Sequence, residues 1–336
     1  MQTIKLIASV LVCMCCAIGQ LKAQRYFVTN QYVYERYFVN PAAAAFRSDC
    51  YSISGYVQNQ WLGTDMAPAT QMLSFQKAFL SNLGSGTYVY NDRNGYHREI
   101  GLQQSLAYNL KLSETRRRRS NLLFGLSLMV AQRSLDMSNY GDAGAVDPVM
   151  GGGKISGHEI NANTGFIWTI NALQLGVSAT NILPFHNSLY SNDEEPDLAM
   201  DVNFFASSIF QLPERNLYLE PIVFFRRNAR NDSRTDFNLK FTMPNPTSSY
   251  SVWGALAYRR TIDESIGKSL GAAMTLGIMK NSYLVGVEYQ LGLTSARADY
   301  GNYYKLIVGY RFCRDRFNDA IPCSSDKDMI KVGRKR

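Results

Sequence analysis

Apolar and polar residues alternate along three long stretches of the chain. In residues 121–133, every second position from Leu122 to Val130 is apolar, and residues 100–110 and 304–312 repeat the pattern with little interruption. The opposite faces carry Gly, Gln, Ser, Lys and Arg. A period of two over such lengths predicts β-strands. Because charged faces do not suit the core of a sandwich but do suit a wet lumen, the pattern favours a transmembrane barrel.

The same alternation marks an even number of strands, fourteen in all. They are residues 51–62, 70–80, 86–93, 99–113, 121–136, 158–170, 172–183, 198–213, 216–230, 234–244, 250–262, 269–279, 282–293 and 302–313. We therefore predict an all-β fold, an outer-membrane antiparallel β-barrel spanning residues 50–313. No later stretch has the roughly 18 apolar residues of a membrane helix. The mean hydropathy of −0.19 fits strands whose alternating faces average to neutrality.

The connections between these strands fall into a short set and a longer set. An even barrel places both of its ends on the periplasmic side. The periplasmic connections are then the short ones, at 81–85, 114–120, 171, 214–215, 245–249 and 280–281. The outer connections are longer, at 137–157, 184–197, 263–268 and 294–301, with short exceptions at 63–69 and 231–233.

Both ends of the chain are predicted to lie outside the barrel. A basic start, a short apolar run at 6–19 and the sequence Leu21-Lys22-Ala23 predict a signal peptide over residues 1–23. Residues 24–49 are predicted to form a small periplasmic segment. Residues 314–336, which are rich in Lys and Arg, are predicted to form a basic periplasmic tail.

The chain offers little for catalysis or metal binding. Its three histidines are scattered at His97, His158 and His186. Beyond the signal peptide, an odd number of cysteines remains, with no CxxC pair. We therefore predict no enzyme activity, no cofactor and no metal site. Export also excludes nucleic acid as a partner, although the net charge is +8.

Four consecutive arginines lie in one predicted periplasmic turn: Arg116, Arg117, Arg118 and Arg119. One interpretation is a solvated turn that holds positive charge at the membrane surface. The other is a docking point for an acidic periplasmic partner. The residues leave both interpretations open.

Two motifs flank the first predicted strand. Asn40-Pro41-Ala42-Ala43-Ala44-Ala45 ends an aromatic-rich segment, and Gln60-Trp61-Leu62-Gly63-Thr64-Asp65-Met66-Ala67-Pro68-Ala69-Thr70 leads into the second strand. They resemble two motifs of the PorP/SprF family of outer-membrane proteins, Asn-Pro-Ala-Tyr-Ala-Gly and Gln-Trp-x-Gly-x-Asp-Gly-Ala-Pro-x-Thr. Here Ala43 and Ala45 replace the Tyr and the Gly of the first motif, and Met66 replaces the second Gly of the other.

Each motif has a structural and a functional interpretation. Gly63 and Pro68 fix an unusual backbone course, Asp65 can accept backbone N–H bonds, and Trp61 can anchor the turn. The second motif is either a rigid hairpin that sets strand register or a recognition loop for a secreted or surface partner. The first is either a periplasmic plug or latch, or a lead-in to the first strand. The candidate partner-binding residues are Asn40, Pro41, Trp61, Gly63, Asp65, Ala67, Pro68 and Thr70, with the four arginines.

The resemblance implies an outer-membrane scaffold or anchor of the type IX protein secretion and gliding machinery. It implies three kinds of partner: outer-membrane lipid, periplasmic ring or peptidoglycan-linked lipoproteins of the system, and secreted proteins with C-terminal sorting domains. The chain would be either a core component or the anchor of one adhesin. The alternative is a small diffusion porin, with a lumen lined by Lys111, Arg133, Glu288, Lys305 and Arg311.

Overall fold

The computed structural model describes most of the predicted barrel and part of the segment that precedes it. The described residues are 30–46, 50–60, 63, 66–80, 82–115, 119–136, 153–183, 199–212, 216–229, 233–245, 250–261, 269–292 and 303–313. The predicted signal peptide and the predicted basic tail lie outside these ranges.

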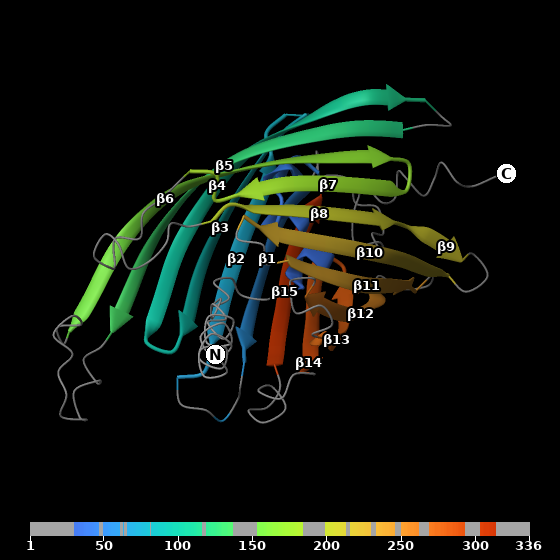
Figure 1. Ribbon diagram of the computed structural model, residues 1–336. Helices are drawn as coiled ribbons and strands as arrows, with labels where there is room; N and C mark the ends of the chain where they lie inside the picture. The colour runs from blue at the N-terminus through green and yellow to red at the C-terminus, as the bar shows by residue number, and fades with distance from the viewer. Residues whose placement is uncertain are drawn as a thin grey trace, which may run out of the picture.

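The strand segments form one antiparallel sheet that closes on itself (Figure 1). β1 pairs with both β2 and β15, and the wall closes because β11 pairs with both β10 and β12. β8 and β9 follow each other along β10 and together make one strand of the wall. The barrel therefore has fourteen strands, which confirms the prediction. The bounds are β1 (Cys50–Asn59), β2 (Ala69–Ala78), β3 (Leu83–Asn94), β4 (His97–Glu114), β5 (Arg119–Asp136), β6 (Lys154–Ile170), β7 (Leu173–Thr180), β8 (Asp201–Ser208), β9 (Phe210–Leu212), β10 (Leu217–Asn228), β11 (Ser233–Pro244), β12 (Tyr250–Thr261), β13 (Ser269–Lys280), β14 (Tyr283–Leu291) and β15 (Tyr303–Cys313).

Alternation along the strands separates an apolar outer surface from a mostly polar interior. On β5, Leu126 points outward with 69% of its surface exposed, whereas Leu123 on the opposite face is buried. Exposed large hydrophobic residues come from every part of the wall. A closed sheet with an apolar outer surface is the arrangement that a lipid bilayer requires.

The barrel has two rims, which carry different connections. We call the rim that holds the short β2–β3, β6–β7 and β13–β14 connections the turn end, and the opposite rim the loop end. Outward-facing tyrosines contact across strands near both rims, Tyr283 with Tyr310 at the turn end and Tyr289 with Tyr304 at the loop end. Aromatic residues at both edges of an apolar band are typical of membrane barrels.

The predicted strands differ from the observed ones mainly at their ends. The largest difference is β6, which begins at Lys154 rather than at residue 158 because its backbone pairs with β5 as far as Asp136. Lys111 was expected in the lumen, but its side chain is 44% exposed and pairs with Glu114 at 3.1 Å. The β4–β5 register shifts between Lys111 and Ser113, which breaks the alternation close to the rim.

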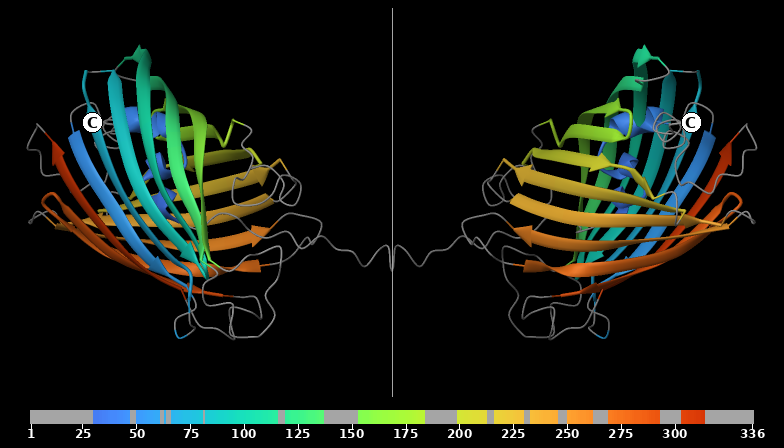
Figure 2. Two further views of the ribbon diagram at one scale, coloured as in Figure 1. Left: turned by 90° about the vertical axis from the view of Figure 1, so that its left-hand side faces the viewer. Right: turned by 90° about the vertical axis from the view of Figure 1, so that its right-hand side faces the viewer.

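Residues 30–46 lie inside the barrel. They form three short 3-10 helices, η1 (Gln31–Val33), η2 (Arg36–Phe38) and η3 (Pro41–Ala45), which Figure 2 shows in dark blue within the ring of strands. From the sequence, residues 24–49 are predicted to lie outside the barrel, whereas the described part of that segment is enclosed by the wall. Within the described ranges, no helix is long and apolar enough to cross a membrane.

Candidate functional site in the barrel lumen

The segment 30–46, which we call the plug, is almost wholly buried. Its polar residues are enclosed as completely as its apolar ones: Gln31 is 0% exposed, Asn40 1% and Tyr37 1%. Its first helix, with the two residues that flank it, contacts β10 to β12, and its last helix packs against β2 to β6. The plug therefore crosses the lumen from one side of the wall to the other. Its side chains form the centre of the molecule's buried apolar cluster.

Asn40 fixes the start of the last helix and binds it to the wall. Its side-chain Oδ1 accepts a hydrogen bond from the backbone N–H of Ala42 at 3.0 Å, and Pro41 occupies the first helical position. Both features are typical of helix starts. The Nδ2 of Asn40 donates to the carbonyls of Phe166 on β6 and Val177 on β7, at 3.1 and 3.0 Å. One side chain thus satisfies its own polar groups, caps η3 and positions it against the wall.

Two wall glycines allow the plug backbone to approach this closely. A Cβ at Gly125 on β5 would lie 2.3 Å from the Ala42 nitrogen. A Cβ at Gly165 on β6 would lie 2.1 Å from the Asn40 Oδ1. Gly125 and Gly165 face each other across the β5–β6 pair. Together they form a shallow seat for the Asn40-Pro41-Ala42 segment, which any side chain would fill.

Arg36 makes the main charged contact between the plug and the wall. Its guanidinium forms a salt bridge with Glu220 on β10 and donates to Gln174 on β7 and, at 2.9 Å, to Ser207 on β8. It also lies over the ring of Phe205, 5.3 Å from the centroid. Because the pair is buried, its charges are little screened by water or salt, and losing one partner would leave the other uncompensated.

The first helix of the plug joins a second polar network. The Tyr32 hydroxyl donates to Asp236 at 2.7 Å and accepts from Asn238 at 3.0 Å, both on β11. Asn30 accepts from Arg259 on β12 at 2.9 Å. Burial raises the pKa of Tyr32 well above the usual value for a phenol, so this hydroxyl remains a donor at neutral pH.

Aromatic contacts fill the space between the polar ones. Tyr32 stacks on Phe224 with ring centroids 4.3 Å apart, and the ring centroids of Tyr34 and Trp253 are 4.4 Å apart. The Tyr37 hydroxyl is 2.9 Å from the Ser105 hydroxyl on β4. Such aromatic pairs stabilise the packed state by more than the burial of their apolar area alone. The plug is therefore fixed by packing as well as by charge.

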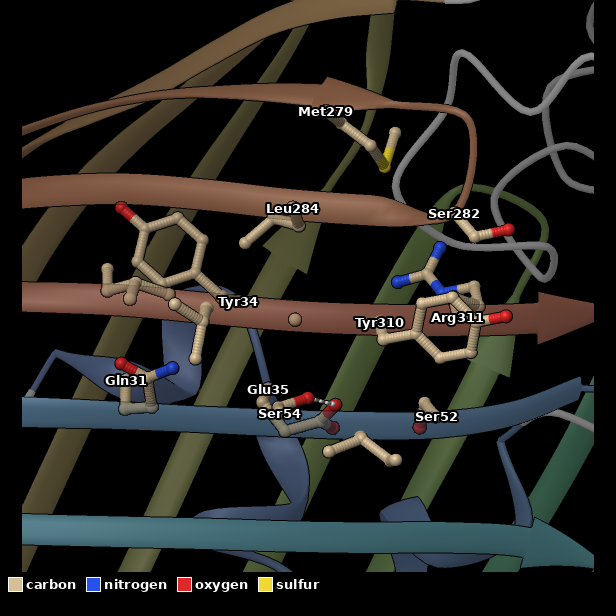
Figure 3. Close-up of a pocket in the computed structure, with 14 residues that line it drawn as sticks. Gln31, Tyr34, Glu35, Ser52, Ser54, Met279, Ser282, Leu284, Tyr310 and Arg311 are labelled. Atoms are coloured by element: carbon tan, nitrogen blue, oxygen red, sulfur yellow. Dashed lines mark hydrogen bonds between the residues drawn. The ribbon is translucent and has the colours of Figure 1, made fainter.

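Two cavities lie between the plug and the wall among the described residues. Figure 3 shows a cavity between the plug and the β1–β15 seam, where Tyr34 and Glu35 face Ser52, Ser54 and Arg311. Its volume is about 30 Å³, which is enough for about one or two water molecules. Ser54 donates to Glu35 across it at 3.2 Å.

A larger cavity of about 100 Å³ lies on another side of the plug. Phe38, Met72 and Met129 contribute apolar surface, and Asp201 and Arg226 contribute charge. Neither cavity is large enough for a diffusion channel. In chemical terms, the site is a plugged lumen with paired charges.

The structure places the sequence-predicted site residues in three separate regions. Asn40 and Pro41 are in the plug. Gly63, Ala67, Pro68 and Thr70 lie at the loop end, and Arg119 begins β5 at the turn end. Trp61, Asp65, Arg116, Arg117 and Arg118 lie outside the described residues. The predicted residues therefore do not form one site.

The loop-end motif has an ordered backbone where it is described. Gly63 has a φ of 97° and Met66 a φ of 59°. The Gln60 N–H donates to the Pro68 carbonyl at 2.9 Å. The Thr70 hydroxyl donates to Asp92 in the interior at 2.5 Å. The left-handed conformation at Gly63 accounts for a glycine at that position.

Sequence reasoning missed the parts of the plug other than Asn40 and Pro41. Arg36, Tyr32 and Tyr37 all lie in a run of aromatic residues that has no helical or strand period. The one available signal was the density of Tyr and Phe in that run, which is high for a solvated segment. Among the described residues, no group of three or more His, Cys, Asp or Glu could hold a metal ion.

Replacing Asn40 with alanine should destabilise the plugged state. The change removes the cap on η3 and two hydrogen bonds to the wall. We expect a loss of about 2–4 kcal/mol, from about 1 kcal/mol for each lost cap or hydrogen bond plus the unpaired carbonyls. The measurement is the temperature at which the folded barrel loses its compact gel mobility. Asn94→Ala, at an exposed strand end, is the control and should leave that temperature unchanged; an equal temperature for the two variants would refute the role of Asn40.

Comparisons with known proteins identify a family. A family model described as type IX secretion system membrane protein PorP/SprF matches residues 21–310. No curated protein is similar enough to count as a match. Among solved structures, CdiB from Acinetobacter baumannii is 9% identical with a TM-score of 0.42, over 79% of this chain and 60% of that one.

Two further structures are similar to the chain over more of their own length. The toluene transporter TodX of Pseudomonas putida is 11% identical with a TM-score of 0.47, covering 85% of this chain and 94% of that one. A FadL homologue from Pseudomonas aeruginosa is 11% identical with a TM-score of 0.44, covering 81% and 93%.

Proposed function

The chain belongs to the PorP/SprF family of type IX secretion system membrane proteins, and we propose that it acts as an outer-membrane scaffold or anchor of that machinery. Membership of a secretion membrane family, together with a closed barrel whose outer surface is apolar, places the protein in the outer membrane. The observation that carries the scaffold role is the buried plug, because a lumen filled by the chain itself leaves the rims as the surfaces that partners can reach.

The two rims supply contact surfaces on the two sides of the membrane. With the turn end toward the periplasm, Arg116, Arg117, Arg118 and Arg119 would face the ring or peptidoglycan-linked lipoproteins of the system. At the loop end, the motif from Trp61 to Thr70 would face secreted proteins with C-terminal sorting domains. Residues 1–23 would be removed as a signal peptide, and residues 314–336 would form a periplasmic tail. We propose no catalytic step for either rim.

Within the machinery, two roles remain alternatives. The protein serves either all secreted substrates, as a core component, or one surface adhesin, as its dedicated anchor, with gliding motility as a consequence. A diffusion porin is disfavoured because the plug and the paired wall charges occupy the space that a water channel would need.

The experiment is a comparison of cell-surface and medium proteomes between wild-type cells and cells that lack this gene. Accumulation of many proteins with C-terminal sorting domains in the periplasm would support the core role. Loss of one adhesin from the surface would support the anchor role. Restoration by the wild-type gene is the control. Unchanged export and an unchanged surface would contradict the proposed function.

A further inference from the structure

A polar patch interrupts the apolar outer surface of β2 to β4 near the loop end. It consists of Gln71, Asn91, Arg93 and Arg98, with Asn59 of β1 beside it. These residues and Ala69 surround a hollow of about 350 Å³. Arg93 and Arg98 are exposed, and Asn91 is half-buried. We call this surface the basic patch.

The register places the basic patch at the edge of the apolar band. Arg93 and Arg98 are directly opposite each other on β3 and β4. In the next outward-facing row toward the turn end, Asn91 pairs with Gln71 and Ile100. The row after that is apolar, with Leu73, Val89 and Leu102. The arginines therefore lie close to the loop end, on the rim side of this apolar row.

The charges of the two arginines are not compensated within the described part of the chain. Neither forms a salt bridge there with an acidic side chain, and like charges directly opposite each other destabilise a sheet. The neighbouring acidic residues face the interior instead, where Asp92 accepts from Thr70 and Glu99 pairs with Arg133 at 2.9 Å. A bound anion would remove this repulsion.

The amide of Asn91 holds one arginine in place. It accepts a hydrogen bond from the Nε of Arg98 at 2.8 Å and donates to Gln71 at 3.2 Å. This bond uses the Nε of Arg98 and leaves the terminal guanidinium nitrogens to donate elsewhere. A planar guanidinium with free N–H groups is well suited to bidentate binding of phosphate.

We propose that the basic patch binds the phosphate group of an anionic lipid in the outer leaflet of the outer membrane. Arg93 and Arg98 would bind the phosphate, and Asn59 and Gln71 would contact neighbouring hydroxyls of the headgroup. The acyl chains would lie along the apolar row of Leu73, Val89 and Leu102. The N–H groups that would bind the phosphate lie next to an apolar surface, and this combination favours a lipid over free phosphate. The site goes beyond the scaffold role, because it would fix the depth and orientation of the barrel.

The test is a binding titration on the full barrel in detergent, and native mass spectrometry measures the fraction of barrel that carries the probe. The probes are bisphosphorylated lipid A, its dephosphorylated form and inorganic phosphate. The double variant R93Q/R98Q should bind the phosphorylated lipid at least about tenfold more weakly, because charge-assisted hydrogen bonds are lost. R260Q removes another exposed arginine, near the loop end of β12, and should bind like the wild type.

Three outcomes would overturn the proposal. They are equal binding by wild type and R93Q/R98Q, equal binding of the phosphorylated and dephosphorylated lipids, and displacement of the lipid by millimolar inorganic phosphate. The last result would indicate a site for free phosphate. Both substitutions are on the exposed surface, so the double variant should fold. Its compact gel mobility is the check that the barrel has folded.

Discussion

Replacing Gly125 with alanine is expected to displace the plug from the lumen. The added Cβ would lie 2.3 Å from the nitrogen of Ala42 and 2.4 Å from the carbonyl carbon of Pro41, both of them backbone atoms. Neither side can yield easily, because Gly125 is paired with Ala107 on β4 and Gly165 on β6. Overpacking of this kind costs about 3 kcal/mol or more when the backbone cannot shift. An energy of that size lowers the equilibrium constant for the plugged state by about a hundredfold.

Limited proteolysis measures this displacement directly. Trypsin should leave the folded wild type uncut at Arg36, whose side chain is only 12% exposed. The G125A variant should be cut there at a much higher rate. Gly309→Ala is the matched control, because a Cβ at that position would meet nothing nearer than 3.4 Å. If G125A resists trypsin at Arg36 as well as G309A does, while both keep the compact gel mobility, the seat formed by Gly125 has no role in holding the plug.

Reversing the charge of Arg36 is the second change with a large expected effect. In R36E, a carboxylate would lie next to Glu220, and the hydrogen bonds to Gln174 and Ser207 would be lost. Breaking a buried ion pair in this way costs about 3–5 kcal/mol. The milder R36M should have a smaller effect, because Glu220 keeps its salt bridge with Lys240 at 3.1 Å.

Chymotrypsin cleavage after Tyr37 measures the effect of these variants. We expect fast cleavage in R36E, intermediate cleavage in R36M and none in the wild type. Arg226→Glu is the control, because it breaks a wall salt bridge with Asp201 that does not include the plug. Cleavage of R226E at the same rate as R36E would mean that any buried charge change loosens the barrel, and that the plug contact of Arg36 is not specific.

The barrel itself could be predicted from the sequence because its physical signal is local. Each strand presents alternate residues to lipid and to the interior, so Leu126 and Ser127 fall on opposite faces whatever the rest of the chain does. The inward orientation of Arg133, Glu288 and Lys305 was predicted for the same reason. Their pairing was not, because the contact of Lys305 with Glu288 joins neighbouring strands at a register that alternation alone does not determine.

The plug could not be predicted because non-local contacts determine its structure. Its 3-10 helices are too short for a periodic pattern, and Asn40, Arg36 and Tyr32 take their partners from strands more than a hundred residues away. The role of Gly125 could not be predicted for a related reason, because a glycine that faces the lumen is also compatible with an open pore. Only the plug backbone beside it shows why a side chain is excluded.

The most direct test of a permanently filled lumen is the electrical conductance of the purified protein in a planar bilayer. The wild type should be silent, because residues 30–46 cross the lumen and are packed against the wall on both of its sides. A variant in which a flexible Gly/Ser linker replaces residues 30–46 should show steady openings. This variant is the positive control, because its openings show that barrels inserted in the bilayer are detected. Steady ohmic openings from the wild type, equal to those of that variant, would contradict the plugged scaffold and favour a diffusion porin.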